Sequence, residues 1–192
     1  MDSYFVTPFT TDQTRYQSNR TLELTSLRIR QAKQEDLNGL TDVLLKSFHP
    51  NSTWLHPIFR LGVYEDVKSR LNCKLSYYSC LIASDPSCDQ VVGTIELTLR
   101  PISLLGKCLP YISNLAVSTD CRRQGVALKL LERCEQIVAH WGFREIWLHV
   151  LEDNLTAQHL YRKKGYTTFK IETDLGNLIF KKPKKILLLK KL

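Results

Sequence analysis

A strand, a helix and a second strand follow one another directly between residues 111 and 151. The first strand is "YISNLAVS" (111–118) and the second is "EIWLHVL" (145–151). Between them, from about Gly125 to Trp141, apolar residues recur at three- and four-residue steps, which is typical of an amphipathic helix. Two strands joined by a helical crossover lie parallel in one sheet, and the crossover is almost always right-handed. The fold must therefore contain a parallel pair of strands.

The rest of the chain predicts strands and helices with short connections. In chain order they are a strand at 27–32, helices at 35–48 and 61–71, strands at 77–84 and 90–99, a helix at 154–165, and a hairpin of 166–174 with 177–182. The second helix is expected to begin only after a break at Pro57. Apart from the crossover, nothing requires parallel pairing. The sequence thus predicts an α/β fold with a mixed, mostly antiparallel sheet.

The composition fits one globular domain flanked by two short segments. The chain has 192 residues, 43% of them hydrophobic, which is enough to bury a core. We expect residues 1–26 to form a flexible arm, residues 27–182 the domain, and residues 183–192 a basic and apolar tail. Such a tail suits weak contact with an anionic membrane or an acidic partner, and a solvated basic end is the alternative.

Charge and cysteine usage favour some classes of protein over others. The net charge is +8, but the C-terminal lysines supply much of it, so we expect no specific nucleic-acid partner. Six cysteines lack the spacing of a metal site and are interpreted as reduced thiols. With no signal or transit peptide recognisable, they predict a cytoplasmic protein that holds no metal. No apolar run approaches the roughly 20 residues of a membrane span. The sequence leaves monomer and dimer open.

The start of the crossover helix has the character of an anion site. Arg122, Arg123 and Gly125 stand where the helix begins, and a helix N-terminus presents free N–H groups and a partial positive charge. Neither GxxxxGKS/T nor GxGxxG occurs in the chain, so a P-loop or a dinucleotide fingerprint does not explain these residues. A tight strand-to-helix turn with solvated arginines is the alternative.

Two motifs together resemble the GCN5-related N-acetyltransferases (GNAT), which move an acetyl group from acetyl-CoA to an amine. The first is Arg122-Arg123-Gln124-Gly125-Val126-Ala127, and the second comprises Asn154, Ala157, Leu160, Tyr161, Gly165 and Tyr166. The resemblance covers roughly residues 27 to 180. It implies a seven-stranded sheet with a splayed parallel pair in the middle and helices on both faces, which agrees with the element order.

The resemblance also implies how acetyl-CoA binds, without a metal. The pyrophosphate would lie on the backbone of the helix start, and the pantetheine arm would run along the strand edge before it. The residues implied are Leu115, Ala116, Val117, Arg122, Arg123, Gln124, Gly125, Val126, Ala127, Leu128, Asn154, Ala157 and Tyr161. Asn154 is equally consistent with a role as the N-cap of its helix, and the two roles are compatible.

Three side chains are candidates for the chemistry. In this family the position of Tyr161 is next to the thioester sulfur, which implies a general acid, although a core tyrosine is the alternative. Tyr111 and His149 resemble the base machinery of eukaryotic-type protein N-terminal acetyltransferases. They lie on neighbouring parallel strands, where the two side chains can share a water. The bacterial ribosomal-protein enzymes carry Glu at the position of Tyr111, so this departure argues against a glutamate base.

Glu96 is a further candidate acid, base or ligand of the substrate ammonium, and an exposed strand carboxylate is the favoured alternative. Three functions remain open. The chain is a protein acetyltransferase for N-terminal α-amines or lysines, a small-amine acetyltransferase for arylalkylamines or polyamines, or a catalytically idle acyl-CoA-binding module. An α-amine loses its proton near pH 8 and a lysine near 10.4, so one modest base serves the first more readily.

Overall fold

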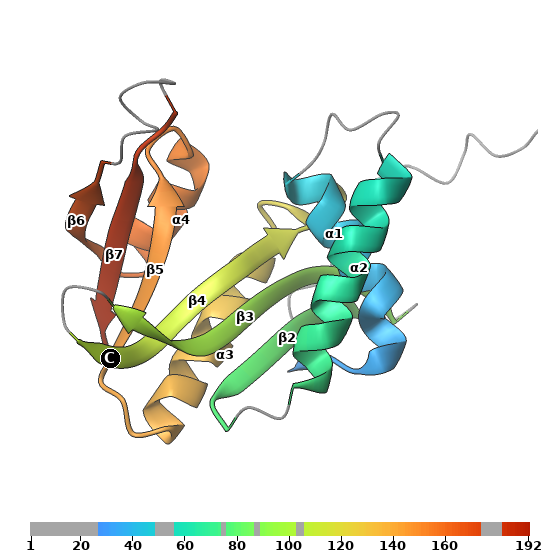
Figure 1. Ribbon diagram of the computed structural model, residues 1–192, viewed down its shortest axis with the longest axis horizontal. Coiled ribbons are helices and arrows are strands. Elements are labelled where there is room, and N and C mark those ends of the chain that lie inside the picture. Colours follow the sequence, from blue (N-terminus) through green and yellow to red (C-terminus); the bar gives the residue numbers. More distant parts are fainter. Residues whose placement is uncertain (1–26, 49–55, 74–75, 87–88, 103–105, 174–181) are drawn as a thin grey trace, which may run out of the picture.

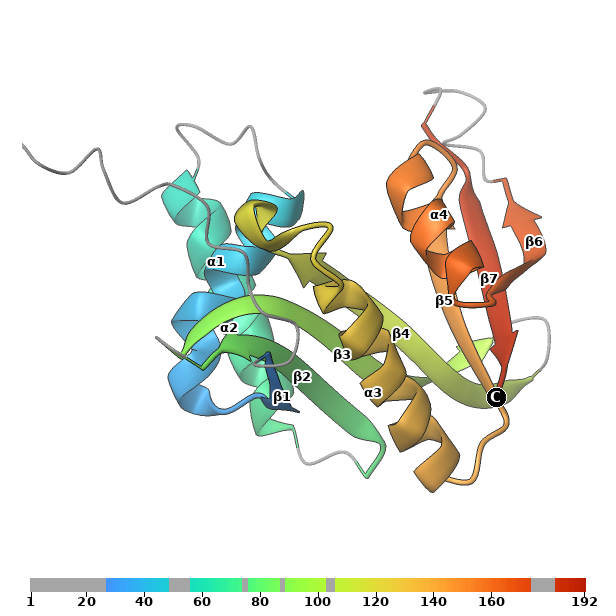
Figure 2. The same cartoon turned by 180° about the vertical axis from the view of Figure 1, so that it is seen from behind.

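The computed structural model describes residues 27–48, 56–73, 76–86, 89–102, 106–173 and 182–192. The arm expected at 1–26 lies outside these residues. The described chain forms one seven-stranded sheet with helices on both of its faces, as Figures 1 and 2 show from front and back.

The sheet has the mixed character that the crossover predicted. Its strands, in spatial order, are β1 (Arg28–Gln31), β2 (Tyr78–Asp85), β3 (Gln90–Ile102), β4 (Lys107–Val117), β5 (Glu145–Leu151), β7 (Lys185–Lys191) and β6 (Thr167–Glu172). The pair β4–β5 is parallel, and the other five pairs are antiparallel. The predicted fold class is therefore confirmed.

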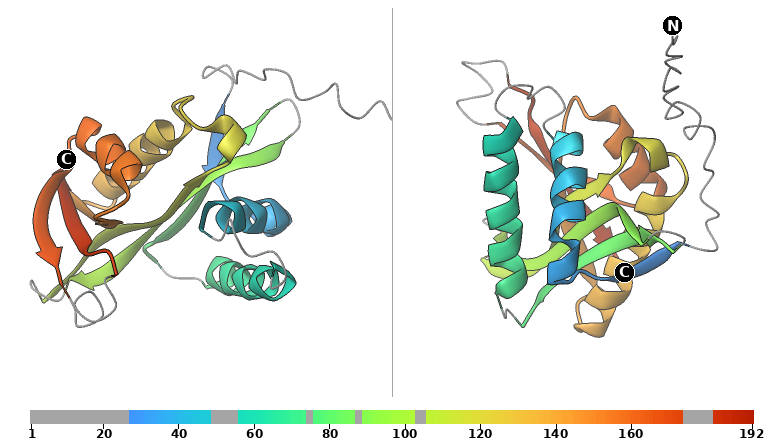
Figure 3. Two further views of the ribbon diagram at one scale, coloured as in Figure 1. Left: turned by 90° about the horizontal axis from the view of Figure 1, so that it is seen from above. Right: turned by 90° about the vertical axis from the view of Figure 1, so that its right-hand side faces the viewer.

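The helices divide between the two faces of the sheet. One face is covered by α1 (Leu37–Phe48) and α2 (His56–Asn72), and the other by α3 (Val126–His140) and α4 (Leu155–Lys163), as the left view of Figure 3 shows. Two short 3-10 turns, η1 (Gln34–Asp36) and η2 (Thr119–Cys121), precede α1 and α3. Each face buries its own apolar cluster, which includes Leu40 and Val67 on the first and Leu130 and Val138 on the second.

The helix α2 begins at His56, five residues before its predicted start. The break expected at Pro57 is wrong, because Pro57 occupies the first turn of α2. A proline is tolerated there because its missing N–H would have no helical acceptor. No helix of the described residues is long and apolar enough to cross a membrane.

The parallel pair β4–β5 is splayed. The two strands pair only at Tyr111 with Trp147 and at Ile112 with Leu148, although β4 continues for five more residues to Val117. On its other side, β4 has a bulge against β3 between Thr94 and Glu96, and Asn114 in that bulge adopts a left-handed φ of 53°. Beyond Ile112 the backbone of β4 thus diverges from β5 and leaves a wedge between the two strands.

The prediction that residues 183–192 form a tail is wrong, because this segment contains the strand β7. β7 pairs with β5 along seven residues and with β6 on its other side. Ile186, Leu187 and Leu188 are buried, so they are not available to a membrane. The lysines at both ends of this segment are typical of a solvated tail. The continuous apolar run between them, however, is also typical of an internal strand that is buried on both faces. The hairpin partner expected at 177–182 lies outside the described residues except for Lys182.

If β7 is a central strand, Leu187→Ala should destabilise the protein markedly. Leu187 is 1% exposed and packs with Tyr111 and Trp147. Truncating such a leucine leaves a cavity and costs about 2–5 kcal/mol. The control is Leu151→Ala on β5, where the leucine is 42% exposed, and it should change stability by less than about 0.5 kcal/mol. Urea unfolding of both variants measures the difference. Equal stabilities would contradict the burial of β7.

Candidate active site

Two of the predicted catalytic side chains meet where β4 and β5 begin to diverge. Tyr111 on β4 lies opposite Trp147 on β5, so Tyr111 shares a sheet face with Trp147 and with His149 two residues further on. The Tyr111 hydroxyl lies 2.8 Å from His149 Nδ1, within hydrogen-bond distance. The direct contact replaces the shared water that the sequence suggested as one possibility.

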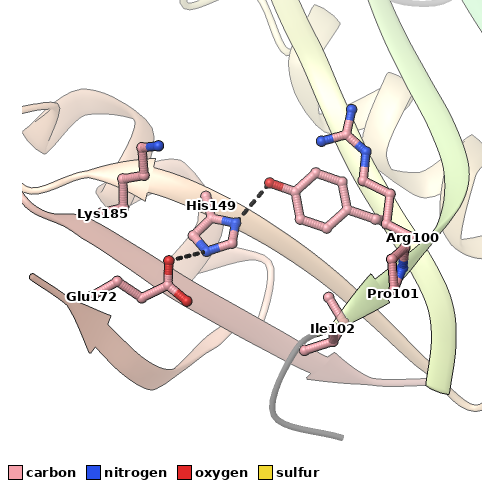
Figure 4. A pocket seen from close by; sticks show the side chains of 7 residues that line it. Arg100, Pro101, Ile102, His149, Glu172 and Lys185 are labelled. Carbon is pink, nitrogen blue, oxygen red and sulfur yellow. Dashed lines mark hydrogen bonds and ion pairs between the residues drawn. The ribbon is translucent and has the colours of Figure 1, made fainter. Parts of the chain in front are cut away.

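A third residue completes the arrangement. Glu172, the last residue of β6, places Oε2 3.1 Å from His149 Nε2, and Figure 4 shows this contact between the imidazole and the carboxylate. Glu172 was not among the predicted site residues. Its neighbourhood depends on β6 and β5 both flanking β7, and no local pattern in "FKIETD" marks it.

These residues line an open pocket of about 350 Å³. Its lining consists of Arg100, Pro101, Ile102, Tyr111, His149, Glu172 and Lys185, contributed by β3, β4, β5, β6 and β7. Arg100 stacks its guanidinium over the Tyr111 ring, 4.6 Å from the centroid. Figure 4 shows Arg100 and Lys185 on opposite sides of His149. The pocket therefore contains three groups that can exchange protons, Tyr111, His149 and Glu172, and two cations, Arg100 and Lys185.

The environment of Tyr111 defines which atom carries the proton. Burial raises the pKa of Tyr111, and the charge of Arg100 partly offsets this effect. The phenol is thus protonated at neutral pH and can donate its O–H to His149 Nδ1. A neutral imidazole has one donor and one acceptor, so in that arrangement its own proton is on Nε2, where the Glu172 carboxylate can accept it.

Tyr161, the third predicted catalytic residue, lies on the other face of the sheet. It is on α4, it is 7% exposed, and its ring packs edge-on against Tyr166 with centroids 5.7 Å apart. Burial raises the pKa of Tyr161 to about 12, and Tyr111 is near enough to add to this shift. A phenol with this pKa keeps its proton at physiological pH, as a proton donor must. Tyr161 is also a core residue, so both interpretations of this tyrosine are physically compatible.

The loop that precedes α3 is fixed by side-chain hydrogen bonds to its own backbone and by two residues with left-handed φ values. Arg122 Nε donates to the Val117 carbonyl at 3.2 Å, and Gln124 Nε2 donates to the Asp120 carbonyl at 3.0 Å. Arg123 and Gly125 have left-handed φ values of 61° and 76°. The N-cap of α3 is Gly125, which has no side chain, so within the described part of the chain the N–H groups of the first turn receive no N-cap hydrogen bond. This geometry fits an anionic group at the helix start.

The remaining residues expected to contact acetyl-CoA border the wedge. Leu115, Ala116 and Val117 belong to the part of β4 that has left β5, so their backbone edge faces the gap. Asn154 Oδ1 accepts from the Ala157 N–H at 3.1 Å, which confirms its role as the N-cap of α4. Contact of Asn154 with pantetheine remains a prediction.

Glu96 differs from the favoured expectation of an exposed carboxylate. It is 3% exposed, and its Oε1 lies 3.2 Å from Arg70 Nη2 of α2. Burial raises the pKa of Glu96, and the Arg70 charge opposes that shift. Glu96 does not line the pocket of Tyr111. Its contacts indicate that it fixes α2 against the sheet. Among the described residues no cluster of His, Cys, Asp and Glu suits a metal ion.

Comparison with known proteins agrees with the motifs. Residues 41–166 match the Acetyltransferase (GNAT) family. The chain is 29% identical over 164 residues to GCN5-related N-acetyltransferase 10, chloroplastic, of Arabidopsis thaliana, which covers 77% of this chain and 63% of that protein. It is 32% identical over 113 residues to GCN5-related N-acetyltransferase 4, chloroplastic, of the same plant, covering 59% and 36%. The chain thus spans less than two thirds of the length of these relatives.

Solved structures share the fold at low sequence identity. PH1933 from Pyrococcus horikoshii OT3 has a TM-score of 0.69 at 20% identity and covers 86% of this chain and 98% of its own. The ribosomal-protein-S18-alanine N-acetyltransferase from Escherichia coli has a TM-score of 0.64 at 16%, covering 86% and 93%. A PaiA N-acetyltransferase from Thermoplasma acidophilum, in complex with coenzyme A, has a TM-score of 0.65 at 20%, covering 87% and 99%.

Proposed function

Because this chain belongs to the acetyltransferase (GNAT) family, we propose that it transfers the acetyl group of acetyl-CoA to the N-terminal α-amine of a protein. The observation that carries this proposal is the hydrogen bond between Tyr111 and His149 at the wall of an open pocket. An α-amine arrives mostly as ammonium at neutral pH and needs a modest base to become a nucleophile. A tyrosine joined to a histidine supplies such a base.

The described side chains support a direct transfer. The ammonium gives its proton to the Tyr111 oxygen while the Tyr111 proton passes to His149 Nδ1, which leaves a neutral amine and an imidazolium. The amine nitrogen then bonds to the acetyl carbonyl carbon, and the carbon–sulfur bond breaks. Tyr161, whose pKa is about 12, donates a proton to the departing thiolate. The excess proton on the amide nitrogen passes to the Tyr161 oxygen through solvent, and the imidazolium releases its proton to solvent, so both side chains return to their starting state.

The cosubstrate fits the wedge between β4 and β5. An uncapped α3 start beside Arg122 and Gly125 suits the pyrophosphate, because helix N-termini bind anions through free N–H groups. The backbone of 115–117 suits the amides of the pantetheine arm. The acetyl group would then lie in the gap between Tyr111 on one face and Tyr161 on the other.

Lysine side chains and small amines are the competing substrates. The relatives in Arabidopsis thaliana are named only as N-acetyltransferases, and their names specify no acceptor. The deciding experiment measures acetyl transfer from acetyl-CoA to a peptide library alongside serotonin and spermidine. Transfer to free peptide N-termini supports the proposal. Transfer to lysines or small amines alone would replace it, and binding of CoA without any transfer would indicate a non-catalytic module.

The two cations of the pocket predict a preference among peptides. An acidic residue at position two would approach Lys185 and Arg100, so such peptides should be acetylated about threefold to fivefold more efficiently than neutral ones, the scale of an exposed ion pair. Lys185→Met should remove much of this preference. Lys191→Met, at the far end of the same strand, should keep it. The measurement is kcat/KM at low salt for two peptides that differ only at position two. Equal values in the wild-type protein would contradict the prediction.

For the compartment we propose a reducing one, either the cytoplasm or a plastid stroma. Cys73, Cys80, Cys108 and Cys134 are free thiols, and the relatives are named chloroplastic. Fluorescence of a tagged full-length protein in its own cells distinguishes the two.

A further inference from the structure

The imidazole of His149 is contacted at both of its nitrogens. Nδ1 faces the Tyr111 hydroxyl at 2.8 Å, and Nε2 faces Glu172 Oε2 at 3.1 Å. A histidine that accepts a proton through one nitrogen must hold the other nitrogen protonated, and its tautomer is set by the group that this second nitrogen meets. In this chain that group is the carboxylate of Glu172.

The orientation of Glu172 toward His149 is not what its strand neighbours alone would produce. Glu172 on β6 lies directly opposite Lys185 on β7 in the antiparallel register. A cross-strand pair of opposite charges at this spacing ordinarily interacts. Instead, the Glu172 carboxylate contacts the imidazole, while Figure 4 shows the Lys185 ammonium directed away from it.

We propose that Glu172 is a positioning residue for the transfer reaction, which holds His149 in the tautomer that accepts a proton from Tyr111. The inference rests on the proposed function. Glu172 Oε2 accepts the Nε2 proton, so the lone pair of Nδ1 is directed at the Tyr111 hydroxyl. When Nδ1 takes that proton, the negative carboxylate stabilises the resulting imidazolium.

The expected effect of Glu172 on the rate depends on how far its side chain and that of His149 are exposed to solvent. A buried carboxylate that orients a catalytic histidine is worth up to about 10⁴-fold in rate. The Glu172 side chain is 41% exposed and that of His149 27%, so solvent screens the interaction. We therefore expect about tenfold to a hundredfold, the range typical of carboxylates that support a functional histidine from its second nitrogen.

Two substitutions separate the carboxylate's charge from its hydrogen bond. Glu172→Gln keeps an oxygen that accepts from Nε2 but removes the charge, whereas Glu172→Leu removes both. The control is Glu145→Gln, at the opposite end of β5 from His149. Each variant is assayed for kcat and KM on one peptide from pH 6.5 to 9. Nitrogen-15 spectra of the ring report the tautomer of His149 in the same protein without substrate.

Glu172→Leu should lower kcat about tenfold to a hundredfold with KM changed less than about twofold, and Glu172→Gln should lower it less. Among the described residues, the other charged or titratable groups that line this pocket are Tyr111, Arg100 and Lys185, and all remain in place. In the spectra, wild type and Glu172→Gln should show the proton on Nε2, and Glu172→Leu a mixture of tautomers. Glu145→Gln should match wild type in both measurements.

The inference is overturned if kcat is unchanged in both Glu172 variants, or if the tautomer of His149 is the same in Glu172→Leu as in wild type. A wild-type protein that acetylates no amine would instead refute the proposed function. The spectra would still decide whether Glu172 sets the tautomer.

Discussion

Tyr111→Phe and His149→Ala are each expected to lower kcat/KM for acetyl transfer by about 10²-fold or more, the usual scale for a general acid–base group. Each change removes one partner of the 2.8 Å contact through which the ammonium proton leaves. Binding of CoA should barely change, because neither residue belongs to the loop before α3. The two effects should be less than additive, since either change breaks the same proton path.

The pH dependence distinguishes this defect from a defect in thiolate departure. Raising the pH from 6.5 to 9 should recover part of the loss in both variants, because more of the amine then arrives neutral. Tyr161→Phe should not recover, since it lacks the donor to the sulfur at every pH. The series stays below pH 10. Above it the unfolded chain ionises Tyr161 while the folded protein, with a pKa of about 12, resists ionisation, so stability falls between those values.

Purified variants assayed on one peptide across this pH range supply the measurement. Thermal unfolding of each variant checks that it is folded. Wild-type rates in both Tyr111→Phe and His149→Ala would remove the proton path from the mechanism. The acceptor would then be an amine that arrives already neutral.

Local sequence patterns predicted the parts of the fold that depend on local physics. The crossover from 111 to 151 determined the parallel pair, and β5 spans the predicted residues 145–151, a mostly apolar run that is buried at Ile146, Trp147, Leu148 and Val150. The strand β7 was missed because β5, with which it pairs along its whole length, lies much earlier in the sequence, and only this pairing shows that 185–191 is an internal strand. Strand order is a tertiary property that periodicity does not encode.

The same distinction applies to the site. Tyr111 and His149 were predicted from the resemblance to eukaryotic-type protein N-terminal acetyltransferases and from their positions on the two strands of the crossover, and the parallel pairing brings their side chains to one face. Glu172 was missed because its contact requires the sheet order β5-β7-β6. Glu96 was expected to be exposed for a related reason: its ion-pair partner is Arg70, a residue of α2 that reaches it across the helix–sheet interface, and the sequence does not show this contact.

Gly125→Trp should lower the affinity for CoA by about a hundredfold. Gly125 precedes the uncapped first turn of α3, and a side chain there would occupy the space through which a phosphate approaches the N–H groups. Losing two charge-assisted hydrogen bonds of about 1.5 kcal/mol each corresponds to this change. Calorimetric titration with CoA measures it.

Backbone strain is the main confounding effect, because Gly125 has a φ of 76° and any side chain is strained there. Gly142, at the other end of α3, has a φ of 84°, and nothing lies within 4 Å of a Cβ added to it. Gly142→Trp therefore carries a similar strain, about 1–2 kcal/mol, without touching the helix start. The two variants should lose similar stability, and only Gly125→Trp should lose affinity. Equal affinities in the two folded variants would show that the pyrophosphate does not bind at the start of α3.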